Sequence, residues 1–256
     1  QNRFTEKKFI LNTAGAFNKL GIKTTAYALI KEKSDILKNE GLLPGILKTC
    51  TLGYDGKGQF IINNTEEVNK LEIDSDKEYI LEKKIILKKE ISIIVTRFSN
   101  NECLIFDPFE NYHVNQILNR SVIPADITKD ILIKAQQQAK LIAEKLDYIG
   151  TMCVEYFIDE NNNLFVNEIA PRVHNSGHLT INAYNVSQFE NHIRAVCNLE
   201  IIKLKKIYNA EMINIIGEDI KDYRNKSYSK NEFFFDYLKT EIKKKRKMGH
   251  LTTIKP

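Results

Sequence analysis

The sequence predicts an α+β fold, and three observations lead to this prediction. Short apolar segments of strand type recur between turn residues, some of these segments pair as hairpins, and a few helices with amphipathic spacing accompany them. Strands and helices do not alternate regularly, as they would in a parallel α/β sheet. The 256 residues suffice for one large domain or for two to three small ones.

The individual elements can be assigned in chain order. A helix is expected over residues 5–20, because Thr5 can cap its start and Gly21 ends it. Residues 128–146 form the clearest helix, since apolar side chains recur there at helical spacing. Ser187 and Glu190 have capping-box spacing and open a helix over residues 187–199. The expected strands are residues 45–49, 58–62, 78–83, 90–98 and 103–107, two around an Asn-rich turn centred on Asn161 and Asn162, and two short ones in 212–217 and 233–237.

Composition and charge narrow the class of protein. The net charge of +5, from 38 basic and 33 acidic residues, suits an anionic small ligand but is too weak to indicate nucleic acid. No apolar run reaches the roughly 18 residues needed to span a membrane, and no signal peptide is visible. We therefore expect a cytoplasmic protein without a membrane partner. The spacing of the cysteines favours buried thiols over disulfides or a zinc site; they are Cys50, Cys103, Cys153 and Cys197.

A glycine-rich loop, KTCTLGYDGKGQF, joins two expected strands. Gly53, Gly56 and Gly58 lack the spacing of a P-loop or a Rossmann fingerprint, and a strand follows where those motifs need a helix. The backbone N–H groups of such a loop can fold over a polyphosphate as a flap. Asp55 with Gly56 is equally the chemistry of a plain hairpin turn, so both interpretations stay open. Lys48, which ends the preceding strand, favours phosphate because it adds a cation.

A pair of glutamates indicates a metal site. If the hairpin turn centres on Asn161 and Asn162, Glu155 and Glu168 lie opposite each other on one face of the ladder. Two opposed carboxylates on an otherwise apolar face are destabilising unless a cation joins them, and Mg²⁺ prefers carboxylate oxygens. The alternatives are a solvated face and a hairpin register that differs by one residue.

The segment EIAPRVHNSGH follows the second glutamate directly. Its Arg172 and His174 could hold an anionic substrate and the charge that develops during phosphoryl transfer. A polar loop with satisfied side chains is the alternative. Two weaker signals are the connector Glu82, Lys83, Lys84 and Ile85, a plausible edge for an adenine ring, and the basic run KKKRK at 243–247. That run has no aromatic residues between its cations, so a solvated face or an anion contact is favoured over nucleic acid.

Taken together, these motifs resemble a known family. GYDGKGQ, the Glu155 and Glu168 pair and NEIAPRVHNSGH are similar to the ATP-grasp enzymes of the 5-(carboxyamino)imidazole ribonucleotide synthase family, from purine biosynthesis. The resemblance extends from QNRFTEKKF to RKMGHLT, which is nearly the whole chain. PRVHNSGH is its most specific part, since most ATP-grasp ligases carry Asn where this chain has Ala170.

The resemblance implies an ATP-grasp fold, in which two α+β subdomains grip ATP, with a small C-terminal β-rich unit. Residues 1–199 would form the ATP-grasp domain, with a glycine-flap subdomain at about 25–82, and residues 200–256 an incomplete C-terminal domain. The family's N-terminal nucleotide-fold domain has no counterpart in these residues, and the full-length protein would be a homodimer. The chain would act on small molecules and not on nucleic acid.

The activity implied by the resemblance is the carboxylation of 5-aminoimidazole ribonucleotide. ATP and bicarbonate would form carboxyphosphate with two Mg²⁺ ions, and CO₂ would pass to the amine, leaving ADP and phosphate. The implied ATP contacts are Arg3, Lys48, Gly53, Tyr54, Asp55, Gly56, Lys57, Gly58, Gln59, Glu82, Lys83, Lys84, Ile85, Glu90, His113, Asn167 and Glu168. The implied Mg²⁺ ligands are Glu155 and Glu168, and the implied catalytic residues are Arg172, His174 and Lys247. The implied ribonucleotide contacts are Tyr54, Asp55, Arg172, His174, Asn175, Ser176, Arg246 and Lys247.

Two alternatives stay open. One keeps the fold but changes the acceptor, as in the formate-using glycinamide ribonucleotide transformylase, which continues with Asp-Thr-Gly where this chain has Asn175, Ser176 and Gly177. The other is an ATP-binding fragment without turnover.

Overall fold

The computed structural model describes residues 20–50, 58–74 and 76–255. The chain divides into two compact units, a smaller one of Gln1–Lys88 with Phe157–Ile169 and a larger one of Lys89–Tyr156 with Ala170–Pro256. The expected helix over residues 5–20 lies outside the described residues except for its last position, and residues 51–57 of the glycine loop also lie outside them.

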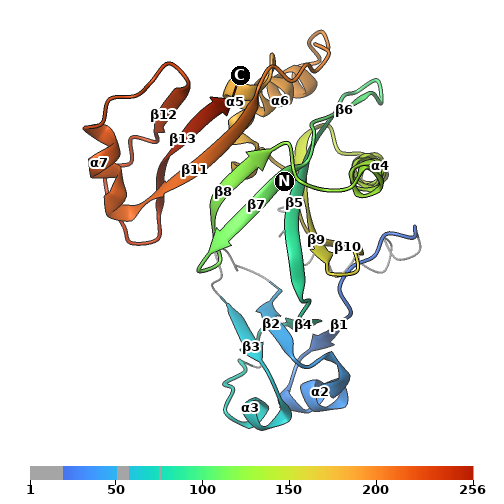
Figure 1. Cartoon of the computed structure of the whole chain (residues 1–256). Coiled ribbons are helices and arrows are strands. Elements are labelled where there is room, and N and C mark those ends of the chain that lie inside the picture. Colours follow the sequence, from blue (N-terminus) through green and yellow to red (C-terminus); the bar gives the residue numbers. More distant parts are fainter. Residues whose placement is uncertain (1–19, 51–57, 75, 256) are drawn as a thin grey trace. The chain divides into compact units, whose positions relative to one another are not determined.

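The smaller unit contains a four-stranded antiparallel sheet with two short helices on one side, as Figure 1 shows. The strands pair in the order β1-β4-β2-β3. Their bounds are β1 Tyr27–Ile30, β2 Gly45–Thr49, β3 Gln59–Ile62 and β4 Tyr79–Lys83. The helical elements are α2 Lys33–Lys38, the 3₁₀ turn η1 Glu40–Leu42 and α3 Thr65–Asn69.

The two faces of this sheet differ because side chains alternate along each strand. Leu47 pairs with Leu81 on the core face, where they pack against Ile36 of α2 and Val68 of α3. The neighbouring position, Lys48, therefore lies on the opposite face of the sheet. The apolar alternation of β2 thus directs one cation away from the core.

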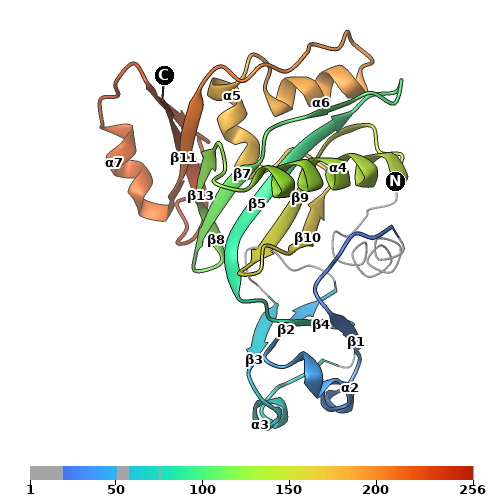
Figure 2. The same cartoon turned by 45° about the vertical axis from the view of Figure 1, so that its right-hand side comes forward.

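The larger unit is built on an antiparallel sheet whose strands run β9-β5-β7-β8-β11-β13-β12, with β6 paired to β5 (Figure 2). The strand bounds are β5 Leu87–Arg97, β6 Cys103–Ile105, β7 Phe109–Val114, β8 Ile117–Ile123, β9 Gly150–Asp159, β11 Asn209–Ile216, β12 Glu232–Asp236 and β13 Lys247–Lys255. The helical elements are α4 Lys129–Lys145, η2 Asn175–Leu179, α5 Thr180–Ala183, α6 Gln188–Val196, η3 Gly217–Asp219 and α7 Ile220–Arg224.

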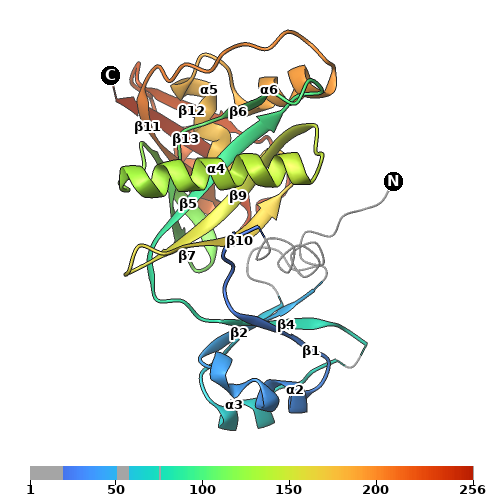
Figure 3. The same ribbon diagram turned by 90° about the vertical axis from the view of Figure 1, so that its right-hand side faces the viewer.

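Helix α4 lies across β5 and β9, as Figure 3 shows. Its apolar stripe, which includes Ile131, Ala135 and Ile142, is buried. The hydroxyl of Tyr156 on β9 donates to the carbonyl of Ala135 at 3.1 Å, so this buried phenol has a hydrogen-bond acceptor. Thr128 accepts a hydrogen bond from the Ile131 N–H and caps the helix, which confirms the expected start.

The hairpin of β9 and β10 (Leu164–Ala170) turns differently from the expectation. The Asn162 N–H donates to the Asp159 carbonyl, and Asn162 has a φ of 59°. The Asp159 N–H donates to the Asn163 carbonyl at 3.2 Å, so Asp159 faces Asn163. The predicted register, centred on Asn161 and Asn162, is therefore wrong by one residue at this turn, because three residues and not two connect the strands.

Most other expected elements are confirmed with small shifts. The strand predicted over residues 90–98 begins earlier, at Leu87, and the hairpin of β5 with β6 forms as expected. The helix predicted over residues 187–199 ends at Val196, and Ser187 caps it by accepting from the Glu190 N–H. Strands β11 and β13 continue the sheet of the larger unit, and the expected domain boundary at residue 199 stays a prediction.

The cysteines differ in burial. Cys50 and Cys153 are buried, as predicted, but Cys103 is half-buried and Cys197 is exposed. The prediction of buried thiols is wrong for these two, because Cys103 begins the short β6 strand and Cys197 follows the last turn of α6. None of the helices in the described part of the chain has the length and apolar character needed to cross a bilayer.

Candidate functional site

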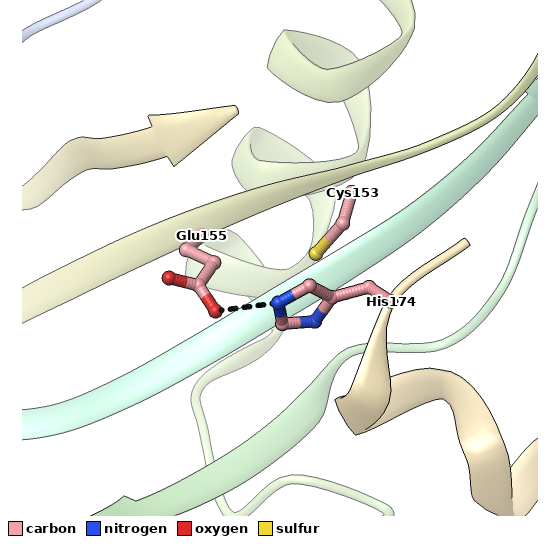
Figure 4. Close-up of side chains that lie close together, drawn as sticks. All are labelled: Cys153, Glu155 and His174. Carbon is pink, nitrogen blue, oxygen red and sulfur yellow. Dashed lines mark ion pairs between the residues drawn. The ribbon is translucent and has the colours of Figure 1, made fainter. Parts of the chain in front are cut away.

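The most constrained feature of the larger unit is the loop that contains His174. It follows Pro171 and enters the 3₁₀ turn η2, for which His174 serves as the N-cap. Glu155 of β9 lies beside it, with 3.3 Å between Glu155 Oε1 and His174 Nε2. Figure 4 shows the imidazole pointing toward this carboxylate, with the thiol of Cys153 nearby. Oxygen, nitrogen and sulfur atoms of the three side chains lie within 4.8 Å of one another.

The surroundings of His174 keep its ring neutral. Burial, together with the positive charges of Arg172 and Lys247, lowers the pKa of His174 to about 3. Arg172 and Lys247, two predicted catalytic cations, therefore lie close enough to the predicted catalytic histidine to affect its charge. Arg172 also donates from Nη1 to the Val173 carbonyl at 3.1 Å.

The backbone of His174 is held by Gln188, the first residue of α6. The His174 N–H donates to Gln188 Oε1 at 2.9 Å, and Gln188 Nε2 donates to the His174 carbonyl at 2.6 Å. Gln188 is fully buried. A Cβ atom on Gly177 would lie 2.6 Å from Gln188 Oε1, so this position requires glycine while the amide occupies its present place.

The two residues after His174 also face inward. Asn175 and Asn214 exchange amide hydrogen bonds of 3.0 and 2.6 Å, and Asn214 also donates to the Leu118 carbonyl. Ser176 is fully buried, and its hydroxyl lies 2.9 Å from His174 Nδ1 and 2.7 Å from the Ser92 hydroxyl. Both residues shape the loop through these bonds, and their expected contact with the ribonucleotide stays a prediction.

A second ionisable pair in the larger unit joins two predicted ATP contacts. His113 Nδ1 lies 2.7 Å from Glu90 Oε2. Burial acts to lower the pKa of His113, but the hydrogen bond and negative charge of Glu90 outweigh it and raise that pKa. Lys247 opposes the increase, which places the lysine in the electrostatic environment of His113 as well.

An aromatic and histidine cluster lies beneath the loop. His178 and His250 have ring centroids 5.2 Å apart, and the hydroxyl of Tyr237 lies 3.0 Å from His250 Nδ1. Burial lowers the pKa of His178 to about 3 and that of His250 to about 4, so both rings are neutral near pH 7. Neither His250 nor Tyr237 was predicted to be part of a site.

In the smaller unit, Lys48 and Glu82 form an ion pair between neighbouring strands. Glu82 lies opposite Ile46, and Ile46 is two residues before Lys48 on β2. Side chains two residues apart on a strand share a face, so Glu82 and Lys48 lie on the same face of the sheet. Their side chains are only 12% and 10% exposed. The lysine predicted to meet ATP and the first residue of the predicted adenine connector therefore come together.

Only the last part of the glycine flap belongs to the described residues. Gly58 has a φ of 73°, and a Cβ on it would lie 2.7 Å from Thr49 Oγ1. Gln59 opens β3, directly after this glycine. Glycine is thus required at residue 58 both by its backbone and by its neighbour. The flap residues Gly53, Tyr54, Asp55, Gly56 and Lys57, together with Arg3, lie outside the described residues.

The other predicted residues are placed as follows. Lys83 and Lys84 are exposed, Ile85 is half-buried, and the backbone N–H groups of the two lysines donate to Ala26 and Pro44. In the basic run, Arg246 is half-buried. Asn167 and Glu168 are half-buried on β10, in the smaller unit, whereas Glu155 belongs to the larger one; the expected pairing of the two glutamates stays a prediction.

The buried polar residues that hold the His174 loop through hydrogen bonds were not predicted from the sequence. They are Gln188, Asn214, Ser92, Asn111 and Ser121, all of which are buried. Their available signal was weak: a single serine inside the apolar run Ile91 to Val95, and an amide directly after a helix cap. In the sequence, each of these residues looks the same as a polar residue without any role in a site.

Comparison with known proteins gives the class first. A family model of the ATP-grasp domain matches residues 15–189, and a model of the phosphoribosylaminoimidazole carboxylase C-terminal domain matches residues 210–256. The chain has antiparallel α+β units, and Lys48 lies on the face of its sheet opposite the core of the smaller unit. Together with the matching family models, these features define it as an ATP-grasp protein. More particularly, the chain belongs to the N5-carboxyaminoimidazole ribonucleotide synthase family.

Individual relatives carry this assignment. The Bacillus subtilis synthase is 41% identical over the whole of this chain, which covers 66% of that protein. The synthase of Staphylococcus aureus strain MRSA252 is 40% identical over 99% of this chain, which covers 67% of that protein. A solved ADP complex of such a synthetase has a TM-score of 0.89 at 38% identity, covering 98% of this chain and 67% of its own. The Aspergillus clavatus synthase in complex with ADP and 5-aminoimidazole ribonucleotide has a TM-score of 0.88 at 27% identity, over 98% and 69%. The chain spans about two thirds of the length of the curated relatives it matches.

Proposed function

We propose that this protein carboxylates 5-aminoimidazole ribonucleotide, using ATP and bicarbonate. The observation that carries the proposal is the contact of Glu155 on β9 with His174 of the PRVHNSGH loop, with Arg172 and Lys247 acting on the same ring. The Aspergillus clavatus relative, whose structure holds ADP and 5-aminoimidazole ribonucleotide, supports this choice of substrate.

The proposed reaction has three steps. The γ-phosphoryl group of ATP passes to a bicarbonate oxygen, which gives carboxyphosphate and ADP. Carboxyphosphate then breaks its bond between carbon and the bridging oxygen, releasing phosphate and CO₂. The amine of the ribonucleotide forms a bond to the CO₂ carbon and gives up a proton to the released phosphate. Arg172 and Lys247 would stabilise the negative charge that gathers on the phosphate and carboxylate oxygens.

Each unit contains residues that we propose contact ATP. In the smaller unit, Lys48 would meet the phosphates as a point charge, and Gly58 permits the backbone geometry of the flap. In the larger unit, Glu90 would accept from ribose hydroxyls, held in place by His113. Lys83, Lys84 and Ile85 would form the edge for the adenine ring.

The donor set fits a hard divalent cation. Glu155 offers carboxylate oxygens at a half-buried position, and Glu168 is half-buried on β10 with Asn167 beside it. Carboxylate and amide oxygens suit Mg²⁺. Glu155 and Glu168 would hold Mg²⁺, which when bound neutralises charge on the nucleotide phosphates.

The direct test measures ADP release by the purified chain with Mg²⁺, bicarbonate and the ribonucleotide. We expect ADP release to need bicarbonate and to rise when the ribonucleotide is added. Glu155→Gln should lose this activity, whereas Glu144→Gln, at an exposed position on α4, should keep it. ADP release that follows another amine or carboxylate acceptor, with no response to the ribonucleotide, would overturn the substrate assignment.

Two further outcomes concern the protein as a whole. ATP binding by calorimetry without any turnover would favour an ATP-binding fragment over an enzyme. The full-length protein is proposed to be a homodimer, and sedimentation analysis would test this separately.

A further inference from the structure

A line of buried polar side chains leads to His174 from the sheet of the larger unit. The Ser121 hydroxyl donates to Asn111 Oδ1 at 2.8 Å, and Asn111 Nδ2 donates to the Ser92 hydroxyl at 2.9 Å. Ser92 donates to the Ser176 hydroxyl at 2.7 Å, and Ser176 lies 2.9 Å from His174 Nδ1. The four residues Ser121, Asn111, Ser92 and Ser176 are called the polar relay below.

Strand register brings the polar relay together. Asn111 of β7 pairs with Glu90 of β5 on one side and with Ser121 of β8 on the other. Ser92 is two residues beyond Glu90 and therefore lies on the same face, diagonally adjacent to Asn111. The three strand residues are 0% to 6% exposed, so water does not compete for their hydrogen bonds.

The relay has a direction, because one of its members is not symmetrical. A serine hydroxyl can donate or accept, but the amide of Asn111 donates only from nitrogen and accepts only at oxygen. Since Asn111 Nδ2 donates to Ser92, the Ser92 proton can pass on to Ser176. The hydroxyl proton of Ser176 is then directed at His174 Nδ1.

A second donor points at the same ring nitrogen. The backbone N–H of Ser176 approaches His174 Nδ1 at 3.4 Å as part of the η2 cap. Both donors need the lone pair of Nδ1, which a proton on that nitrogen would remove. A backbone N–H can only donate, so Nδ1 acts as an acceptor, and the proton of the ring lies on the other nitrogen.

We propose that the polar relay holds His174 as the tautomer with its proton on Nε2, so that the ring donates a hydrogen bond toward the Glu155 carboxylate and toward an anion bound beside it. The 3.3 Å separation of Nε2 from Glu155 Oε1 agrees with this direction. Ser92, Asn111 and Ser121 are thereby positioning residues, since they act on the site through His174.

This tautomer also decides the character of the Cys153, Glu155 and His174 group. A thiol, a carboxylate and an imidazole within 4.8 Å could in principle hold a zinc ion. Coordination through Nε2 needs its lone pair, and the polar relay directs a proton to that atom instead. The group therefore presents a hydrogen-bond donor beside a carboxylate and not a set of three metal ligands.

For the proposed carboxylation, an Nε2–H group would stabilise charge and would not accept a proton. It could donate to a carboxyphosphate or phosphate oxygen in the transition state, as donors in an oxyanion site do. This catalytic consequence rests on the proposed function, whereas the tautomer does not.

Nuclear magnetic resonance tests the tautomer directly. The full chain is labelled with ¹⁵N-histidine, and long-range ¹H–¹⁵N correlations at neutral pH distinguish the two neutral tautomers and the doubly protonated ring. His174→Gln identifies the signals of His174 among those of the five histidines. We expect the Nε2–H pattern. A dominant Nδ1–H pattern, or a doubly protonated ring, would overturn the proposal.

Variants of the polar relay test its cause. Ser176→Ala and Ser92→Ala should each lower the ratio of Nε2–H to Nδ1–H by about fivefold, the effect of one ordinary hydrogen bond. Thr96→Val is the matched control, because it removes another buried hydroxyl of β5, which bonds to Thr151 of β9, and leaves the hydrogen bonds of the relay in place. If both serine variants keep the wild-type ratio, or if Thr96→Val changes it equally, the polar relay does not set the tautomer.

Kinetics supply an independent measurement. Ser92→Ala should lower kcat for bicarbonate-dependent ADP release by about tenfold, as outer hydrogen bonds to a site histidine commonly do, and leave KM for ATP unchanged. A changed tautomer with unchanged kcat would remove the catalytic role but keep the structural one. Failure of the chain to use bicarbonate at all would reject the proposed function and leave the tautomer result standing.

Discussion

The side-chain amide of Gln188 binds both the N–H and the C=O of His174, at 2.9 and 2.6 Å. The two residues thus pair as neighbours in a β-ladder do, although one of the partners is a side chain. Gln188 Nε2 also lies 3.2 Å from His178 Nδ1. A single buried amide therefore fixes the path of the loop that presents the histidine.

Enlarging Gly177 should displace this amide. In Gly177→Ala the new Cβ would lie 2.6 Å from Gln188 Oε1, and overpacking of this kind costs about 1 to 3 kcal/mol. We expect a lower free energy of unfolding and a larger loss of kcat than of ATP affinity, measured by denaturant titration and steady-state kinetics. Gly41→Ala is the control, because a Cβ there meets no atom within 4 Å. Equal effects of the two substitutions would contradict the clamp.

The role of Gly58 can be separated from backbone strain. Gly58 and Gly21 have the same φ of 73°, but a Cβ would meet Thr49 Oγ1 at 2.7 Å only at Gly58, while Gly21 has nothing within 4 Å. Alanine at either position should cost about 1 to 2 kcal/mol for the left-handed backbone. Only Gly58→Ala should also raise KM for ATP, and Thr49→Ala in the same chain should recover part of that loss. No difference between the two glycine variants would show that the contact with Thr49 is unimportant.

The Lys48 and Glu82 pair should affect stability and ATP binding differently. Lys48→Met leaves a carboxylate that is only 10% exposed without its cation, which should lower the free energy of unfolding by about 3 kcal/mol. Lys48→Met with Glu82→Gln should recover much of this stability because no charge is left. KM for ATP should be higher than in the wild type in both variants, since both lack the cation proposed to bind the phosphates. Recovery of ATP affinity together with stability would mean that Lys48 only supports the fold.

Acid should destabilise the larger unit through its buried histidines. The folded pKa values of His178, about 3, and His250, about 4, lie below the ordinary value of 6.5, so the unfolded chain binds more protons in this interval. The free energy of unfolding should therefore fall as the pH decreases below 6.5, by up to about 1.4 kcal/mol per pH unit for each histidine. Denaturant titrations from pH 7 to pH 4 would measure the slope.

Two variants check the origin of that slope. His250→Gln should make it shallower, because one titrating ring is removed while an acceptor for the Tyr237 hydroxyl remains. Tyr237→Phe should lower stability by a similar amount at every pH, since both histidines are kept. A slope that is unchanged in His250→Gln would assign the acid sensitivity to other groups.

Local rules explain how much of the fold could be predicted. Apolar alternation and turn residues predicted most strands of both sheets, but not β1, β7, β8 or β13. Side-chain caps at Thr128 and Ser187 predicted the starts of two helices. The hairpin register was wrong at its turn because Asn162 adopts a left-handed conformation and adds a third loop residue. Nothing in a run of three asparagines distinguishes a two-residue turn from a three-residue one.

The candidate site was predicted only where charge or motif made it visible. Glu155, His174, Glu90 and His113 were each named as site residues, but their contacts with one another were not predicted. The structure places Glu155 beside His174 and Glu90 beside His113. The polar relay could not be predicted, because Ser92, Asn111 and Ser121 are ordinary residues whose meeting depends on the register of three strands. Long-range pairing of this kind is invisible to local patterns.

The register of β5, β7 and β8 restricts where residues can be inserted in the chain. Ser92, Asn111 and Ser121 meet because β5, β7 and β8 each direct one side chain to the same face of the sheet, with Asn111 opposite Ser121 and diagonal to Ser92. One inserted residue within any of these strands would turn its side chain to the opposite face. Insertions should accumulate in the connections at residues 98–102 and 115–116 and be excluded from the strands, a pattern that systematic insertion scanning would reveal.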